Sequence, residues 1–383
     1  MSHLEADARG IALVGQHDLG GHGDAMHVNV HRGYAYVGHM GADRVGTSIL
    51  DVRDPRRPEL VHQLGTPPGT HSHKVQVVDD LLLVNYERNP REVGTAESWE
   101  AGLKVFDIAD PTSPREIAYY RMPGKGVHRM TYVEPPYVWL AGSDEGYADQ
   151  FLIVLDLSDP TSPVEVARWA VPGIALGEES LVPEGRRFAH HHAIPHGDRL
   201  YGTWWDAGFT IHDITDPTAP LLVSHTTLDP AVSGATHTSL PLPGRPVLVV
   251  ADEALDDHGG GPARHVRLFD ISDETAPRLT GQLPVPEGEF RRDARFGPHN
   301  LHEMRPGTFQ SSTRIHLSYF SAGLRVYELG DAHQPVEVAH YLPRVGEHEA
   351  PVQFNDLTVT SDGLVLVTDR LSRGLFILED LGS

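Results

Sequence analysis

Short apolar stretches alternate with turn residues along the whole chain, in a unit that returns about every 55 residues. In the second unit, apolar and polar residues alternate over 74–78, 81–85, 102–108 and 115–120. Alternation with a period of two is the pattern of a half-buried strand, and Gly and Pro separate the runs. Each unit therefore predicts four antiparallel strands, which is the sequence signature of one β-propeller blade.

A second marker, an Asp-Pro-x-x-Pro turn between two apolar strands, repeats with the same period. It occurs in SILDVRDPRRPELVHQL from Ser48, LKVFDIADPTSPREIAYY from Leu103, LIVLDLSDPTSPVEVARW from Leu152 and FTIHDITDPTAPLLVSH from Phe209. Proline fixes φ in such a turn, and the Asp side chain accepts hydrogen bonds from nearby backbone amides. The marker predicts a tight connection between the third and fourth strands of a blade.

The last unit predicts how the ring closes. It contains expected strands at 357–360, 364–368 and 374–379, and the sequence then ends without a fourth strand. Residues 11–19 resemble the fourth strands that follow the proline turns. We therefore expect this N-terminal strand to complete the last blade, 355–383, because pairing it there removes an exposed sheet edge. The prediction is an all-β, seven-bladed propeller that forms one domain over 1–383.

The repeated G-L-x-V-x-D-[IL]-x-D-P-x-x-P units resemble the LVIVD repeat family of propeller proteins. More distantly, the chain is similar to the selenium-binding protein family, which contains copper-dependent methanethiol oxidases. The resemblance extends over nearly the whole chain and implies the propeller fold, whereas propellers host many activities. The chain has no cysteine. This departs from the selenium-binding proteins and argues against their selenium chemistry.

A polar residue recurs just before the first strand of each unit. It is a histidine six times and an asparagine once, in the order His27, His73, His128, His192, His237, His299 and Asn355. The first strand of a blade lies nearest the axis, so these side chains are expected around the mouth of the central channel. Imidazole is the commonest metal ligand among side chains, although a single histidine also caps strands or bonds backbone carbonyls. We expect the ligands of one transition metal ion to come from His73, His128, His192, His237 and His299.

Further groups are expected on the same face, where the second strands end. The predicted catalytic residues are Glu87, Arg129, Asp206 and Asp369. Carboxylates at these positions can orient metal-binding imidazoles or move protons. The predicted substrate pocket contains His27, His71, His191, His302, Asn355 and Arg295. Within His190-His191-His192, neighbouring residues of a strand point to opposite faces, and we selected His192 as the member in register with the repeat.

Composition narrows the classes of partner. With 31 basic and 53 acidic residues, the net charge of −22 disfavours nucleic acid and anionic membranes. No run reaches the roughly 18 apolar residues of a membrane helix, and no signal peptide is recognised at the N-terminus, so a cytoplasmic location is expected. The phosphate loop, the dinucleotide fingerprint and the serine elbow are absent from the sequence. The expected partner is a small-molecule substrate, and the oligomeric state is left open.

The sequence supports three functional hypotheses. The favoured one is a metalloenzyme that carries out oxygen-dependent oxidation of a small organic substrate, with iron or copper favoured and manganese or zinc possible. It is favoured because the expected inner ring consists of neutral nitrogen ligands. A metal-dependent lyase or hydrolase, acting on an anionic substrate through histidine and arginine, is the second. A non-enzymatic interaction scaffold is the third.

Overall fold

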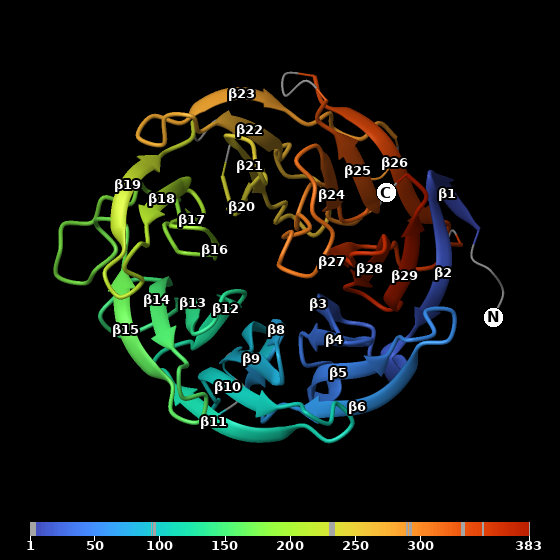
Figure 1. The fold of residues 1–383 in the computed structure, drawn as a ribbon, viewed down its shortest axis with the longest axis horizontal. Helices are drawn as coiled ribbons and strands as arrows, with labels where there is room; N and C mark the ends of the chain where they lie inside the picture. Colours follow the sequence, from blue (N-terminus) through green and yellow to red (C-terminus); the bar gives the residue numbers. More distant parts are fainter. Residues whose placement is uncertain are drawn as a thin grey trace.

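The chain forms a ring of seven antiparallel sheets around a central axis in the computed structural model (Figure 1). The structure describes residues 5–382 except 93, 95–96, 230–233, 289, 291–292, 331–333 and 347. The innermost strands contact one another around the axis. This confirms the predicted seven-bladed, all-β propeller.

The first four blades follow the predicted order from the axis outward. Blade 1 contains β3 (Ala25–His31), β4 (Tyr34–His39), β5 (Val45–Asp51) and β6 (Glu59–Gly65). Blade 2 contains the short strands β7 (Thr70–His71) and β8 (Val75–Val78), which both pair with β9 (Leu81–Arg88), then β10 (Gly102–Asp107) and β11 (Arg115–Arg121). Blade 3 contains β12 (Val127–Thr131), β13 (Tyr137–Gly142), β14 (Phe151–Asp156) and β15 (Val164–Trp169). Blade 4 contains β16 (His192–His196), β17 (Arg199–Thr203), β18 (Phe209–Asp213) and β19 (Leu221–Thr226).

The remaining three blades include both ends of the chain. Blade 5 contains β20 (Thr236–Pro241), β21 (Val247–Asp252), β22 (Val266–Asp270) and β23 (Arg278–Gln282). Blade 6 contains β24 (Arg314–Ser318), β25 (Leu324–Glu328), β26 (Val336–Pro343) and β1 (Ala6–Arg9). Blade 7 contains β27 (Phe354–Val359), β28 (Leu364–Asp369), β29 (Gly374–Asp380) and β2 (Ile11–His17). Short 3₁₀ turns occur at η1 (Leu19–Gly21), η2 (Ala42–Arg44) and η3 (Pro90–Glu92).

The N-terminal segment closes the ring as predicted, and it also adds a strand to blade 6. Strand β2 pairs with β29 from Ile11 opposite Asp380 to His17 opposite Leu375, so it is the fourth strand of blade 7. Strand β1 pairs with β26 and adds an outer strand to blade 6. In that blade the expected innermost strand is reduced to a bridge between Leu301 and Leu317. The N-terminus therefore joins the two last blades.

The Asp-Pro-x-x-Pro segments form the predicted tight turns. In all four segments the Asp before the first Pro accepts a hydrogen bond from the backbone N–H two residues later at 2.9–3.1 Å, and these residues are Asp54, Asp110, Asp159 and Asp216. Each carboxylate satisfies an amide that the turn leaves without a strand partner. The turns lie on the outer rim, away from the axis (Figure 1).

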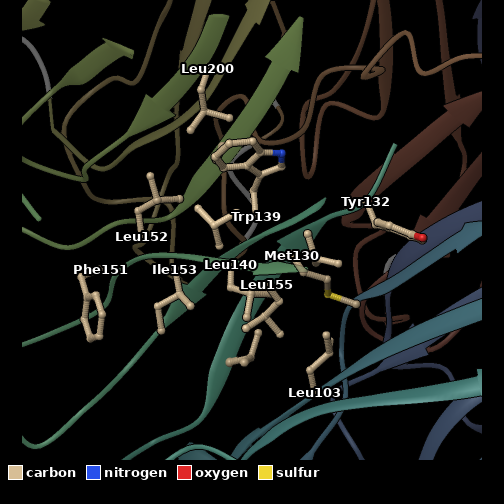
Figure 2. Close-up of a cluster of buried hydrophobic side chains, with 14 of the residues drawn as sticks. Leu103, Met130, Tyr132, Trp139, Leu140, Phe151, Leu152, Ile153, Leu155 and Leu200 are labelled. Atoms are coloured by element: carbon tan, nitrogen blue, oxygen red, sulfur yellow. The ribbon is translucent and has the colours of Figure 1, made fainter. Parts of the chain in front are cut away.

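Apolar side chains pack between neighbouring blades and form the core. Figure 2 shows one such cluster, in which Leu103 of β10, Met130 of β12, Trp139 of β13 and Leu200 of β17 come from three successive blades. Burying a side chain of this size stabilises the fold by about 1.5–3 kcal/mol. No helix in the described part of the chain is long and apolar enough to cross a membrane.

A buried ionic cluster holds the C-terminal strand against blade 6. The carboxylate of Asp380 accepts hydrogen bonds from Arg314 Nε at 2.8 Å and Nη2 at 2.7 Å and from His316 Nε2 at 2.8 Å. Burial opposes ionisation of Asp380, but His316 and Arg314 outweigh it and hold the pKa of this carboxyl well below its usual range. The cluster connects β24 to β29, so it stabilises the closed ring.

Replacing Asp380 with Asn should weaken this closure. We expect Asp380→Asn to lower the free energy of unfolding by about 3 kcal/mol, because it removes the buried carboxylate that both Arg314 and His316 contact and leaves Arg314 paired with Glu328 alone. The depressed folded-state pKa makes the contribution of Asp380 fully present above its unfolded pKa of about 4, and lost as the pH falls below that value. Urea unfolding at pH 7 and pH 3 measures both effects. A loss at pH 7 equal to that of the exposed control Asp362→Asn would contradict this role.

Candidate functional site

A cavity of about 520 Å³ opens where the chain enters the innermost strands. Six histidines line it, namely His71, His73, His128, His191, His237 and His299. Two carboxylates, Glu87 at the end of β9 and Glu253 just after β21, lie among them. The cavity therefore gathers imidazoles and carboxylates from four consecutive blades and the start of a fifth repeat.

The imidazoles form a continuous arc of ring contacts. Their centroids are 4.6 Å apart for His71 and His73, 4.9 Å for His73 and His128, and 5.1 Å for His128 and His191. The arc continues over 3.9 Å from His191 to His237 and over 4.3 Å from His237 to His299. Burial lowers the pKa of His73, His191, His237 and His299, and neighbouring imidazoles or cations lower it further. These rings are neutral at pH 7, so each keeps a lone pair.

The arc corrects the predicted register in two blades. In blades 1, 3, 5 and 7 a β-bulge leaves one residue unpaired at the entrance of the innermost strand, and these residues are Met26, His128, His237 and Asn355. Met26, rather than His27, thus occupies the ring position of blade 1. In blade 4, His191 lies in the arc, and His192 is the first residue of β16. The repeat pattern did not reveal these shifts, because a bulge changes the face of a side chain without changing the spacing of the repeats.

The residues that follow the bulge positions form a second, deeper layer on the axis. It contains His27, Lys74, Arg129, His192 and Asp356, which are all buried. His27 Nε2 lies 3.5 Å from Asp356 Oδ2, and Arg129 Nη2 donates to Glu303 Oε1 at 2.6 Å. Burial lowers the pKa of Lys74 and raises that of Asp356. Arg129, a predicted catalytic residue, and His27 and His192 therefore belong to an axial network beneath the cavity.

Glu253, His237 and His299 form one compact group that faces the cavity. Glu253 Oε2 lies 3.8 Å from His237 Nε2, and Glu253 Oε1 lies 3.5 Å from His299 Nε2. The opposite ring nitrogens have other partners: His299 Nδ1 donates to the Asn355 carbonyl at 2.5 Å, and His237 Nδ1 lies 3.0 Å from Thr238 Oγ1. The Asn355 carbonyl requires the proton of neutral His299 on Nδ1, so the lone pair of His299 Nε2 faces the carboxylate, whereas the Thr238 hydroxyl is compatible with either tautomer of His237. All three ligand atoms lie within 4.8 Å of one another, as a metal site requires.

Glu87 with His71 and His73 forms a similar group on the other side of the cavity. Here the carboxylate has three side-chain partners among the described residues, whereas the carboxylate of Glu253 accepts one hydrogen bond, from Arg295 Nη1 at 3.0 Å. Glu87 Oε2 lies 3.1 Å from His71 Nε2 and 2.9 Å from His128 Nδ1, and Gln150 Nε2 donates to Glu87 Oε1 at 3.2 Å. Burial would raise the pKa of Glu87, but the two imidazoles outweigh it and hold that pKa well below its usual range.

Two aromatic side chains at equivalent tight turns support the arc. Trp205 and Phe320 have positive φ values of 47° and 38°, a conformation that costs a non-glycine residue about 1–3 kcal/mol. Their carbonyls accept hydrogen bonds from the next blade, Trp205 from Thr236 N at 3.1 Å and Phe320 from Phe354 N at 3.1 Å. The ring of Phe320 lies 4.7 Å from that of His299. The turns therefore fix two apolar walls beside the imidazoles.

Three predicted site residues have local structural contacts and do not line the cavity. Asp206 accepts hydrogen bonds from the backbone N–H of Arg187 at 2.9 Å, and Asp369 accepts from that of Gln353 at 2.8 Å. His302 donates to the Phe309 carbonyl at 2.9 Å. The two Asp carboxylates therefore cap turn amides and lie outside the cavity lining, because capping of turn amides competes with exposure to a channel. Asn355 also turns away, since its Nδ2 donates to the Met26 carbonyl at 2.5 Å.

The predicted residues that do line the cavity are Glu87, His71, His73, His128, His191, His237, His299 and Arg295. Lys74, Glu253 and Arg370 also line the cavity, and the sequence pattern predicted no role for them. Two of them are adjacent to a predicted site residue: Lys74 follows His73, and Arg370 follows Asp369. The position next to a predicted site residue was the only sequence signal for them. The folded backbone is needed to show which side chains face the axis.

Comparisons with known proteins agree with this architecture. Residues 22–66, 98–121, 146–171 and 196–227 match the profile of the LVIVD repeat. No curated protein matches the chain. Among solved structures, U3-55K is 12% identical over 96% of this chain and 98% of that chain, with a TM-score of 0.61. The β-propeller domain of Myceliophteria thermophila Cps50 (Swd1) is 13% identical over 94% and 97%, with a TM-score of 0.56. A protein from Lactobacillus plantarum is 12% identical over 83% and 88%, with a TM-score of 0.57. At these identities the likeness shows the fold alone.

The hydrogen bonds of the arc predict one tautomer for two imidazoles. His191 Nδ1 donates to the His237 carbonyl at 2.8 Å, as His299 Nδ1 does to that of Asn355. We expect both rings to remain neutral and protonated on Nδ1 as the pH of metal-free protein falls from about 8 to about 6, because their pKa values are lowered. Long-range ¹H–¹⁵N correlation spectra, assigned with His→Gln variants, report the tautomer.

Exposed His258 is the internal control for this titration. Asp293 raises the pKa of His258, so this ring should gain its charge first as the pH falls. Titration of His191 or His299 together with His258, or protonation on Nε2, would contradict the tautomers inferred from the hydrogen bonds.

Proposed function

This chain belongs to the LVIVD repeat family of seven-bladed propellers, and from that premise we propose that it is a metal-dependent enzyme whose ion is held by His237, His299 and Glu253. The ion would lie at the mouth of the central channel, with its remaining coordination positions toward the cavity. The expected substrate is a small organic molecule. The supporting observations are the composition and the orientation of these three side chains.

The observation that carries the proposal is that acceptor atoms face one another. His299 Nε2 presents a lone pair toward Glu253 Oε1 at 3.5 Å, and His237 Nε2 lies 3.8 Å from Glu253 Oε2. The carboxylate also accepts a hydrogen bond from Arg295 Nη1 at 3.0 Å. Lone pairs and carboxylate oxygens repel one another unless a cation lies between them. A divalent ion would satisfy all three ligands at once. The Asn355 carbonyl holds His299 in the ligating tautomer, and the Thr238 hydroxyl can accept from His237 Nδ1 in that same tautomer.

The Glu87 group is less suited to a metal ion. Its carboxylate is engaged by His71, His128 and Gln150. In addition, the amide Nδ2 of Asn85 lies 3.3 Å from His73 Nδ1, so that nitrogen is an acceptor and the proton of neutral His73 is on Nε2. We therefore assign His71, His128 and Glu87 to proton transfer and to positioning of the substrate.

Two histidines and one carboxylate favour iron or zinc over copper. The expectation of a wholly neutral inner ring was wrong, because Glu87 and Glu253 lie among the imidazoles. The 2-His-1-carboxylate set with open positions is typical of non-haem iron oxygenases, and the same residues hold zinc in hydrolases. Oxygen-dependent oxidation of a small organic substrate remains our leading proposal, and a zinc-dependent or manganese-dependent lyase or hydrolase is the alternative.

An interaction scaffold has weaker support. Large exposed apolar side chains at the start of outer strands are Val164 of β15, Leu221 of β19, Leu279 of β23 and Val336 of β26. They are spaced one to a blade around the rim. Scaffolds bind through contiguous apolar patches, whereas this spacing separates the residues by the width of a blade.

Substitution of the proposed ligands should remove the metal. We expect Glu253→Gln and His299→Ala to lower the affinity for Fe(II) and Zn(II) by more than roughly tenfold, because each removes a ligand. Glu87→Gln should leave the metal content unchanged, since Glu87 is not a proposed ligand. Elemental analysis of purified protein and competition with a chromogenic chelator measure the metal content and the affinity.

His340→Ala is the matched control, because His340 is on the outer strand β26. Thermal unfolding of every variant separates loss of metal from loss of fold. Full metal content in Glu253→Gln and His299→Ala would refute the assignment. Nitric oxide, a probe of open iron positions, should give an electron paramagnetic resonance signal in Fe(II)-loaded protein. Iron-loaded protein without that signal would leave the lyase or hydrolase as the surviving form.

A further inference from the structure

The cavity is rich in cations although the whole chain has a net charge of −22. Six basic side chains line it, namely Lys74, Arg88, Lys125, Arg187, Arg295 and Arg370, against two carboxylates, Glu87 and Glu253. Positive charges inside a concave, poorly solvated site focus the field there and attract anions. The local excess of cations therefore opposes the charge of the rest of the molecule.

Several of these cations have carboxylate partners in the wall. Arg187 Nε donates to Asp149 Oδ2 at 2.8 Å, and Arg295 Nη1 donates to Glu253 Oε1 at 3.0 Å. Arg370 differs from them. Its Nη1 donates to the amide oxygen of Asn355 at 3.3 Å, and no carboxylate of a described residue lies within 4 Å of its guanidinium. Most of the donors of Arg370 are therefore available to a ligand.

The surroundings of Arg370 raise the free energy of its unpaired positive charge. The guanidiniums of Arg370 and Arg295 lie 5.5 Å and 5.7 Å from the centre of the same Phe320 ring. Burial and, next, the charge of Arg295 lower the pKa of Arg370 to about 10, so Arg370 stays charged at neutral pH. Two like charges beside one aromatic ring repel, and a bound anion would compensate for that repulsion.

Arg370 is also adjacent to the proposed metal site. Asn355 connects them, because its side-chain oxygen accepts from Arg370 and its backbone carbonyl accepts from His299 Nδ1. A ligand whose anionic group contacts Arg370 therefore extends by only a few atoms before it reaches His299 and Glu253. Trp205, Met26 and Leu255, which line the cavity, offer apolar surface to a short carbon skeleton.

We propose that this cavity binds small organic acids through a carboxylate held by Arg370, with a second oxygen of the acid directed toward His299 and Glu253. The planar guanidinium donates two parallel hydrogen bonds to a carboxylate, which a lysine cannot reproduce. The ligand class is short dicarboxylates and hydroxy or oxo acids. This assignment of the substrate class rests on the proposed function for its metal-directed half, whereas the contact with Arg370 stands without a metal.

Calorimetric titration of metal-free protein with malonate tests the Arg370 contact. We expect wild-type protein to bind malonate, and Arg370→Gln to bind it at least about tenfold more weakly, because a charge-assisted bidentate contact is lost. Arg370→Lys, which keeps the charge without the planar fork, should recover only part of the affinity. Arg32→Gln, at the exposed turn after β3, is the matched control and should bind as the wild type does.

The outcomes separate this inference from the proposed function. Unchanged malonate binding by folded Arg370→Gln, or no binding by the wild type, would overturn the anchor. Inorganic phosphate bound as tightly as malonate would overturn the carboxylate assignment. Metal content is measured independently in the same variants. Malonate binding that depends on Arg370, in a protein that takes up no metal, would contradict the proposed function and support the anion site.

Discussion

Convergence of the innermost strands on one axis is the constraint on which the rest of this molecule depends. Each blade brings the entrance of its first strand to the same radius, so one residue per blade meets its counterparts from the other blades. At the axis these residues lose water, and their polar atoms need partners from the neighbouring blade. His191 bonds the His237 carbonyl, His299 bonds the Asn355 carbonyl, and Asn355 bonds that of Met26. The same contacts join the blades and orient the imidazoles.

Along the axis, the polar groups that are paired within the protein lie in one layer, and those that face the cavity lie in another. In the deeper layer, Arg129 pairs with Glu303, and His27 lies beside Asp356, so buried charge is compensated within the protein. The residues just before this layer in sequence face the cavity, and there the charges and polar atoms are only partly paired. Glu253 faces the lone pair of His299 there, and Arg370 lacks a carboxylate partner among the described residues. Incomplete compensation in a concave site is what a ligand-binding centre requires.

Sequence reasoning predicted the fold, the blade count and the closing strand, because period and alternation are local properties. It also brought His73, His128, His237, His299 and Glu87 to the cavity. It failed where a single residue decided the outcome. Because of a bulge, Met26 rather than His27 occupies the ring position of blade 1. At the entrance of β16, His191 rather than His192 occupies that of blade 4.

The sequence by itself determined that seven four-stranded units close into a ring and that histidines gather at one end of its axis. The hydrophobic period and the turn residues are local patterns of a few residues, so they can be recognised in the amino-acid sequence. Only the tertiary structure decided which of two adjacent side chains enters the cavity, as in Arg370 rather than Asp369 and His191 rather than His192. The physical reason is that side-chain direction alternates with every residue, and bulges and turn capping reset that alternation through contacts made between blades.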